Sequence, residues 1–187
     1  MIKVTNNEYK KICRTLADRI FAKDDTKITI DEYNLLKLQE VQEELKLIVD
    51  QYMNQDKYDE SKEALNNMIT ILGRFAKNNF KVMTDIPTEY FNNYLETYSY
   101  YLINNVITLF KLGEYKSAMD MVNYAGKINV KGNSDFYATL DNMAFNLSIK
   151  SGEMPKVLFK ELYKDGLSYE VAVENLKTII NEGMLPS

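Results

Sequence analysis

Residues 88–129 read TEYFNNYLETYSYYLINNVITLFKLGEYKSAMDMVNYAGKIN. Apolar side chains recur three or four residues apart in two runs, which are Tyr90, Phe91, Tyr94, Leu95, Tyr98, Leu102, Val106 and Leu109, and then Tyr115, Ala118, Met119, Val122 and Ala125. This spacing places each run on one face of a helix. Gly113 separates the runs, and glycine readily takes the left-handed conformation that ends many helices. The stretch therefore predicts two antiparallel helices joined by a tight turn.

The turn over residues 109–118, LFKLGEYKSA, resembles the turn of a tetratricopeptide repeat. In such repeats glycine makes the turn, tyrosine packs across it, and a small alanine lets the helices approach closely. Residues 42–72 resemble this hairpin in outline, with Tyr58 in the place of Tyr115 and Asp56 in the place of Gly113. A hairpin of this kind needs neighbours of the same kind to bury its second face.

No stretch alternates with period two, so we predict an all-α fold of about eight helices. These helices form degenerate tetratricopeptide-like hairpins in a short right-handed array, as a single domain over residues 1–187. N-terminal helices are expected over 1–41, hairpins over 42–151 and short closing helices over 152–187. We expect Ser134 to cap the helix that carries Leu140 and Leu147, a closing helix over Pro155–Lys164, and a last helix capped by Ser168.

Composition excludes several function classes. The chain has 0 His, which removes histidine-dependent triads and the common zinc and di-iron sites. Its formal net charge of −4 and scattered lysines disfavour a nucleic-acid surface. The single cysteine, Cys13, cannot form an intrachain disulfide, and no stretch has the length and apolarity of a membrane span or signal peptide. We expect a cytoplasmic binding protein that is not an enzyme, with no cofactor, no metal and no membrane contact.

Asparagine inside helices gives the candidate binding residues. Asparagine is a poor interior helix former, yet Asn104 and Asn105 interrupt an apolar run, and Asn142 and Asn146 lie one turn apart on a later helix. In a helical-hairpin array the first helix of each pair lines the concave face, where an amide can donate to and accept from a peptide backbone. Tyr101 belongs to a tyrosine ladder that forms either the core or an aromatic wall of the site. Each asparagine has the alternative of a partner within the protein or in solvent.

From Tyr52 onward the chain resembles the C-terminal regulatory domain of the Rgg/GadR/MutR family of Gram-positive transcription regulators. The resemblance lies in YMNQDKYDE at 52–60, LINNVI at 102–107, the turn at 113–118, Phe136-Tyr137 and the short closing helices. It implies a cytoplasmic homodimer that binds a short peptide pheromone on the concave face, which changes DNA binding by a helix-turn-helix domain.

The chain departs from this family at its N-terminus. Residues 1–54 predict two helices, and the second is too acidic for a recognition helix, so we expect no DNA-binding domain and no direct nucleic-acid contact. The chain is then either a regulatory fragment or a stand-alone relative. The alternative function is a helical-repeat adaptor or chaperone-like scaffold that binds a protein segment.

Overall fold

A computed structural model describes residue 47 and residues 49–85, 89–153 and 158–182. These residues form helices and connecting turns, and no strand occurs among them. A helical segment over residues 49–54 is followed by α3 (Tyr58–Asp85), α4 (Glu89–Lys111), α5 (Tyr115–Ile128), α6 (Ser134–Ser151), α7 (Phe159–Leu162) and α8 (Tyr169–Asn181). The predicted all-α fold is confirmed, while the helices expected over 1–41, and Cys13 with them, lie outside the described residues.

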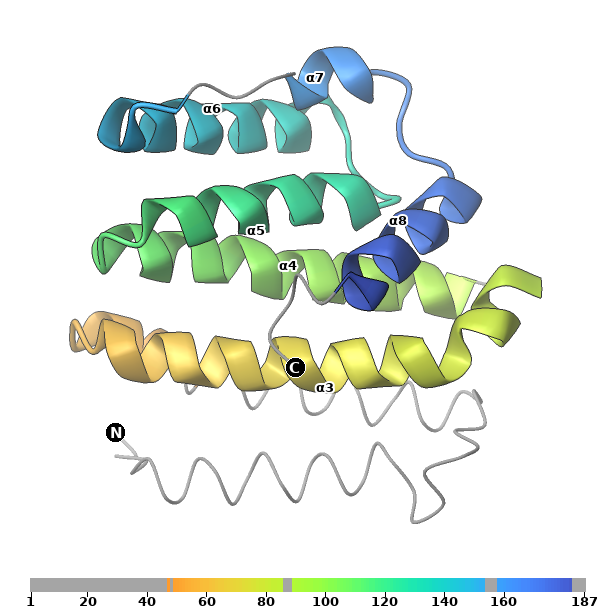
Figure 1. Ribbon diagram of the computed structural model, residues 1–187, viewed down its shortest axis with the longest axis horizontal. Coiled ribbons are helices and arrows are strands. Elements are labelled where there is room, and N and C mark those ends of the chain that lie inside the picture. The colour runs from red at the N-terminus through yellow and green to blue at the C-terminus, as the bar shows by residue number, and fades with distance from the viewer. Residues whose placement is uncertain (1–46, 48, 86–88, 154–157, 183–187) are drawn as a thin grey trace.

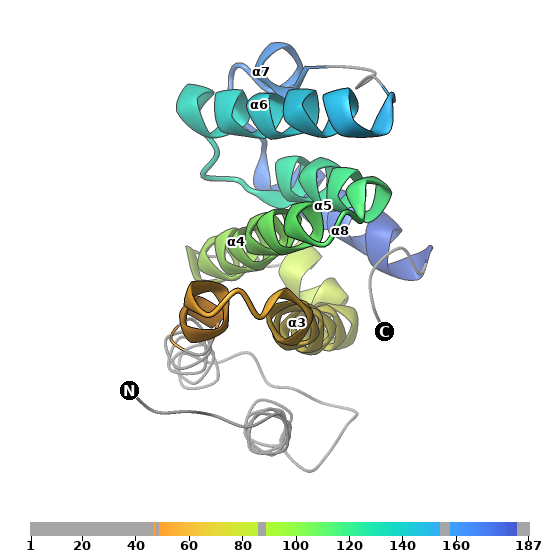
Figure 2. The ribbon, with the colours of Figure 1, turned by 90° about the vertical axis from the view of Figure 1, so that its left-hand side faces the viewer.

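The helices stack in chain order. α3 packs on α4, α4 on α5 and α5 on α6, while α7 lies on α6 (Figure 1). Seen end-on, segment 49–54 and α4 lie toward one side of the stack, and α5 and α8 lie toward the other (Figure 2). The hairpins are thus laid side by side, as the repeated helical periodicity predicts.

The turn between α4 and α5 has the predicted form. Gly113 takes a φ of 77°, and its N–H donates to the Phe110 carbonyl at 3.1 Å. The Glu114 N–H donates to the Leu109 carbonyl at 2.9 Å. These bonds satisfy carbonyls that the helix end leaves without partners, and they hold α5 antiparallel to α4.

The preceding turn repeats this geometry with a different residue. Asp56 takes a φ of 56° and donates its N–H to the Met53 carbonyl at 3.2 Å. The Lys57 N–H donates to the Tyr52 carbonyl at 2.9 Å, five residues back, like Glu114 in the later turn. Asp tolerates the left-handed region better than most residues, and here its carboxylate accepts the Tyr58 hydroxyl at 2.8 Å. The two turns are structural repeats of each other.

Two boundaries differ from the prediction. The side chain of Asn133, rather than Ser134, caps α6, because its backbone is extended and its oxygen accepts the Phe136 N–H at 2.9 Å. Within the described residues α7 covers only Phe159–Leu162, and Gly166 adopts a φ of 85° soon after it. Ser168 caps α8 as predicted.

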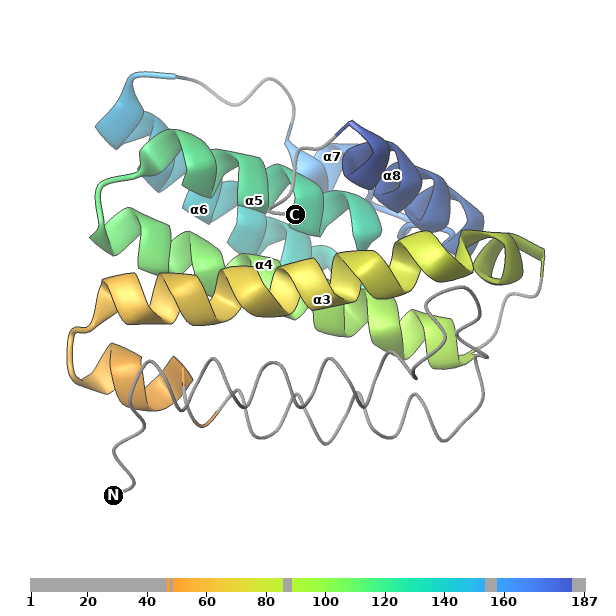
Figure 3. The same cartoon turned by 60° about the horizontal axis from the view of Figure 1, so that its bottom comes forward.

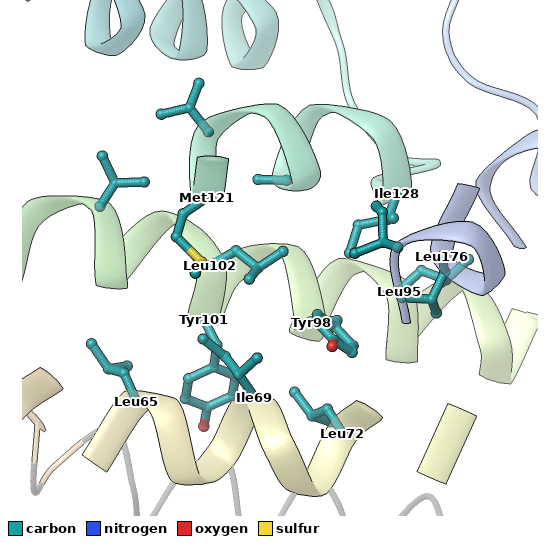
Figure 4. Packing of buried hydrophobic residues seen from close by; sticks show 14 of the residues in the cluster. Leu65, Ile69, Leu72, Leu95, Tyr98, Tyr101, Leu102, Met121, Ile128 and Leu176 are labelled. Carbon is teal, nitrogen blue, oxygen red and sulfur yellow. The ribbon is translucent and has the colours of Figure 1, made fainter. Parts of the chain in front are cut away.

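The tyrosine ladder of α4 forms the core between α3 and α4. The rings of Tyr94, Tyr98 and Tyr101 are each 1% exposed or less, and Figure 4 shows Tyr98 and Tyr101 directed toward the side chains of α3. Tyr94 and Tyr98 meet edge to face, with ring centroids 6.0 Å apart. The core interpretation is confirmed for these three tyrosines, whose side chains lie inside rather than at the rim.

The last helix does not extend the stack. α8 turns back from α7 and packs on α5 and on α3 (Figure 3). It buries Ala172, Val173, Leu176 and Ile179, which share one helix face. The array is therefore closed along one side by its own C-terminal helix.

Candidate functional site

Two of the predicted binding residues lie in the interior. Asn105 is 0% exposed, and its amide donates to the Asn66 side-chain oxygen on α3 at 2.9 Å. Tyr101 is 1% exposed. Neither side chain has surface to offer a ligand in this conformation, so the structure assigns Asn105 the alternative role of an amide paired within the protein.

Polar side chains continue this pairing along the α3–α4 interface. The hydroxyls of Ser61 and Thr108 lie 3.2 Å apart, and both residues are buried. The side-chain oxygen of Asn105 has no hydrogen-bond partner among the described residues. Because unpaired polar atoms are costly in a core, these contacts favour one register of α3 against α4. We read them as structural rather than as a ligand site.

The remaining predicted residues reach the surface. Asn104 on α4 is half-buried and donates its amide to the Tyr100 carbonyl one turn earlier, at 2.8 Å. Asn142 and Asn146 are exposed and lie one turn apart on α6. They lie on a different helix from Asn104, so these amides form no single cluster.

The sequence prediction missed the apolar side chains that accompany these amides. Phe145 and Ile149 on α6 are 56% and 65% exposed, and Ile107 on α4 is 41% exposed. Leu47, at the start of the preceding helical segment, is 71% exposed. Large apolar side chains left in water on neighbouring elements mark candidate interaction sites. The sequence predicts that these residues lie in helices. Which face of each helix stays exposed to solvent depends on how the helices pack together.

Two side-chain contacts connect α4 with the elements that carry the other exposed side chains. Both α4 and α6 run from right to left in Figure 1, but the view in Figure 2 shows α6 inclined to α4. Lys131, just before α6, forms an ion pair with Glu96 of α4 at 3.0 Å. On the other side of α4, the Thr108 hydroxyl contacts the Met53 sulfur at 3.5 Å, and Met53 belongs to the helical segment over residues 49–54.

We call this region the first-helix surface, because the helical segment over residues 49–54, α4 and α6 each occupy the first position of a hairpin. Its members are Leu47, Tyr100, Ile103, Asn104, Ile107, Asn142, Phe145, Asn146 and Ile149. The four members on α6 are exposed, whereas on α4 only Ile107 is exposed and Tyr100, Ile103 and Asn104 are half-buried. The surface combines apolar area with side-chain amides and carries no charged member.

The described residues give little support to a metal site, an acid–base pair or a membrane-spanning helix. No group of three or more acidic or cysteine side chains there could hold a metal ion. Burial raises the pKa of the Asp120 carboxyl on α5, an effect that Lys116 partly offsets and Glu153 reinforces. One such carboxyl on another helix does not make an acid–base pair with the first-helix surface. In the part of the chain that is described, the helices also lack the length and apolarity needed to span a bilayer.

Comparison of the chain with protein-family models, with curated proteins and with solved structures finds no match in any of the three. The resemblance to the Rgg/GadR/MutR regulators therefore stays an interpretation of sequence pattern, and the candidate site rests on its geometry.

Proposed function

We propose that the first-helix surface binds a short peptide segment in an extended conformation. The observation that carries this proposal is the exposure of apolar side chains on successive first helices, with Ile107, Phe145 and Ile149 between 41% and 65% exposed. Isolated exposed apolar residues are common on proteins. Here they recur on α4 and α6, the first helices of two successive hairpins, as expected for a ligand that crosses from one to the other.

The chemistry of the surface suits a peptide. Asn142 and Asn146 each offer a donor and an acceptor to a peptide backbone, and the isoleucine and phenylalanine side chains offer contacts to apolar ligand side chains. We expect the bound segment to be apolar and without net charge.

Together with the sequence resemblance, this surface supports a sensing role. The chain would act in the cytoplasm as the peptide-binding and dimerising part of a transcription regulator, in which a pheromone changes the activity of an associated DNA-binding domain. The alternative is an adaptor or chaperone-like scaffold that holds a segment of a partner protein. A sensor would select one peptide sequence, whereas a scaffold would accept many.

Selection from a displayed library of random peptides tests the proposal. We expect one family of related apolar sequences, and a synthetic member of it should raise the melting temperature, because binding to the native state stabilises it. Unrelated sequences that bind equally well would favour the scaffold. Failure to select any binding peptide would refute peptide recognition.

Matched variants locate the site. Phe145→Ser and Ile149→Ser should each weaken binding of the selected peptide by about tenfold, since truncating a central apolar contact costs more than ~1 kcal/mol. Val171→Ser is the control, because Val171 is 46% exposed but lies on α8. Equal affinity of all three variants would exclude the first-helix surface as the binding site. Solution mass with and without the peptide tests dimer formation.

A further inference from the structure

The Thr108 hydroxyl on α4 lies where three elements of the array meet. It is 3.2 Å from the Ser61 hydroxyl of α3, 3.5 Å from the Met53 sulfur of the helical segment over residues 49–54, and 3.4 Å from the carbonyl of Asn104 on α4 itself. Thr108 is 0% exposed, and Figure 2 shows the segment beside α3 and below α4. We call this contact of the segment and α3 with α4 the first joint.

Few other polar contacts hold the first joint together. The Asn105 amide donates to the Asn66 side-chain oxygen at 2.9 Å, but its own side-chain oxygen has no hydrogen-bond partner among the described residues. The ion pair of Lys62 with Glu114, at 2.8 Å, joins α3 to the turn before α5, but both side chains are partly exposed. Exposed ion pairs contribute little to stability. Loss of the Thr108 hydroxyl is therefore not readily offset by another polar contact at this joint.

The next joint, where α4 and α5 meet α6, is held by different residues. The amide of the buried Asn129 donates to the Ser99 hydroxyl of α4 at 3.3 Å, and its carbonyl accepts the Tyr137 hydroxyl of α6 at 3.4 Å. The Asn129 side-chain oxygen accepts the Lys131 N–H at 3.0 Å. Thr108 takes no part in these contacts, so a change at Thr108 perturbs the first joint and leaves this second joint intact.

The first joint lies directly beneath one part of the first-helix surface. Asn104, whose carbonyl Thr108 contacts, is a member of that surface, and Ile107 precedes Thr108 in the chain. Leu47, another member, comes two residues before the helical segment that carries Met53. The angle between this segment and α4 therefore sets how far Leu47 lies from the exposed side chains of α4.

We propose that Thr108 is a positioning residue, whose hydroxyl fixes the angle of the first joint and so the spacing of the first-helix surface between Leu47 and Ile107. Thr108 is buried and touches no ligand itself. A joint that samples several angles has fewer molecules in the binding-competent arrangement, and apparent affinity scales with that fraction. The effect on peptide binding rests on the proposed function, whereas the effect on the angle does not.

Distances between spin labels test the angle without a ligand. In a chain that carries Cys13→Ser, labels on cysteines at the exposed positions Asp50 and Lys150 span both joints, whereas labels at Lys111 and Lys150 span only the second. Thr108→Val removes the hydroxyl and keeps a branched side chain, and Thr108→Ser keeps the hydroxyl. Pulsed electron–electron double resonance should show a shifted or broader Asp50–Lys150 distance distribution in Thr108→Val. Thr108→Ser should restore it, and the Lys111–Lys150 distribution should stay the same in every chain.

Peptide affinity then tests the link to the binding surface. A library-selected peptide should bind Thr108→Val about three to ten times more weakly than the unaltered chain, and Thr108→Ser should recover most of the loss. A change in the distances without a change in affinity would show that Thr108 does not position the binding surface, and would leave the proposed function standing.

Other outcomes would overturn the inference at the joint itself. Identical distance distributions in all three chains, even with a lower melting temperature for Thr108→Val, would show that the hydroxyl only adds stability. An equal change for both label pairs would show a general loosening of the array rather than a change at the first joint. Failure of all three chains to bind any selected peptide would refute the proposed function, and with it the role of Thr108 in binding, while the label distances still decide its role in the angle.

Discussion

Tyr94 and Tyr98 offer a direct test of how the core is held together, because they carry the same group in two different environments. Both side chains are buried on α4, at 1% and 0% exposure. The Tyr94 hydroxyl donates to the Leu72 carbonyl of α3. The Tyr98 hydroxyl has no hydrogen-bond partner among the described residues. Replacing either residue with phenylalanine removes one oxygen and leaves the ring.

Tyr94→Phe should therefore lower the free energy of unfolding, whereas Tyr98→Phe should not. Tyr94→Phe gives up a hydrogen bond and should lower the free energy of unfolding by about 1 kcal/mol. Tyr98→Phe removes a buried hydroxyl that makes no hydrogen bond within the described residues. This substitution should leave the free energy of unfolding unchanged or raise it by up to about 1 kcal/mol. The corresponding shifts in melting temperature are about 2–4 °C per kcal/mol for a chain of this size.

Equilibrium unfolding in guanidinium chloride, followed by far-UV circular dichroism, measures both changes. The free energy of unfolding should depend on denaturant concentration with a similar slope in both variants. A shift in the midpoint concentration then reports a change in stability. If Tyr98→Phe destabilises the chain as much as Tyr94→Phe does, its hydroxyl is satisfied in solution and the proposed arrangement of this interface is wrong.

The same pair predicts a pH dependence. Burial raises the pKa of both phenols above their ordinary value of 10.0, and for Tyr94 the neighbouring Tyr98 adds to the effect. The folded chain keeps these protons at pH values where the unfolded chain loses them, so stability is full below about pH 10 and falls above it. Each buried tyrosine should contribute about 1 kcal/mol to the loss between pH 10 and 11. Either phenylalanine variant should reduce that loss by the same amount.

Further predictions concern the docking of α7. A Cβ at Gly126 would lie 2.5 Å from the Phe159 ring, so Gly126→Ala should destabilise the chain by about 1–3 kcal/mol in thermal unfolding. Gly73→Ala is the matched control, since its Cβ would meet only a hydroxyl at 3.4 Å and should be neutral or stabilising through helix propensity, by up to about 1 kcal/mol. The Asp141 carboxylate accepts the N–H groups of Phe159 and Lys160 at 2.8 and 3.0 Å. Asp141→Asn should weaken this charge-assisted cap by about 1–2 kcal/mol and speed proteolysis at α7, and unchanged proteolysis would contradict the role of the cap.

Local sequence signals account for the hairpins. The apolar period and Gly113 predicted the hairpin that the structure shows as α4 and α5, within a few residues. The equivalence of Asp56 and Gly113 could be predicted, because each ends a helix shortly before a tyrosine. In the structure both residues adopt a positive φ. Propensity and periodicity act over a few residues, so they are visible in one sequence.

Packing between distant elements was not predictable in this way. The pairing of Asn105 with Asn66 depends on the register of α3 against α4, which no local pattern encodes. The return of α8 onto α3 and α5 joins elements that lie far apart in the chain. The exposed faces of α4 and α6, which define the candidate site, likewise emerge only when all helices are in place. Asparagine in a helix was thus an ambiguous signal: it marked a core pair at Asn105 and exposed amides at Asn142 and Asn146.

Isoleucine methyl NMR during titration with a library-selected peptide tests the proposed binding surface most directly. Ile103, Ile107 and Ile149 lie on the first-helix surface, whereas Ile69 and Ile179 are buried, on α3 and on α8. We predict that saturating peptide shifts the methyl signals of the first three and leaves those of the other two nearly unchanged. Shifts confined to Ile69 and Ile179, or no shifts despite binding, would contradict peptide recognition by the first-helix surface.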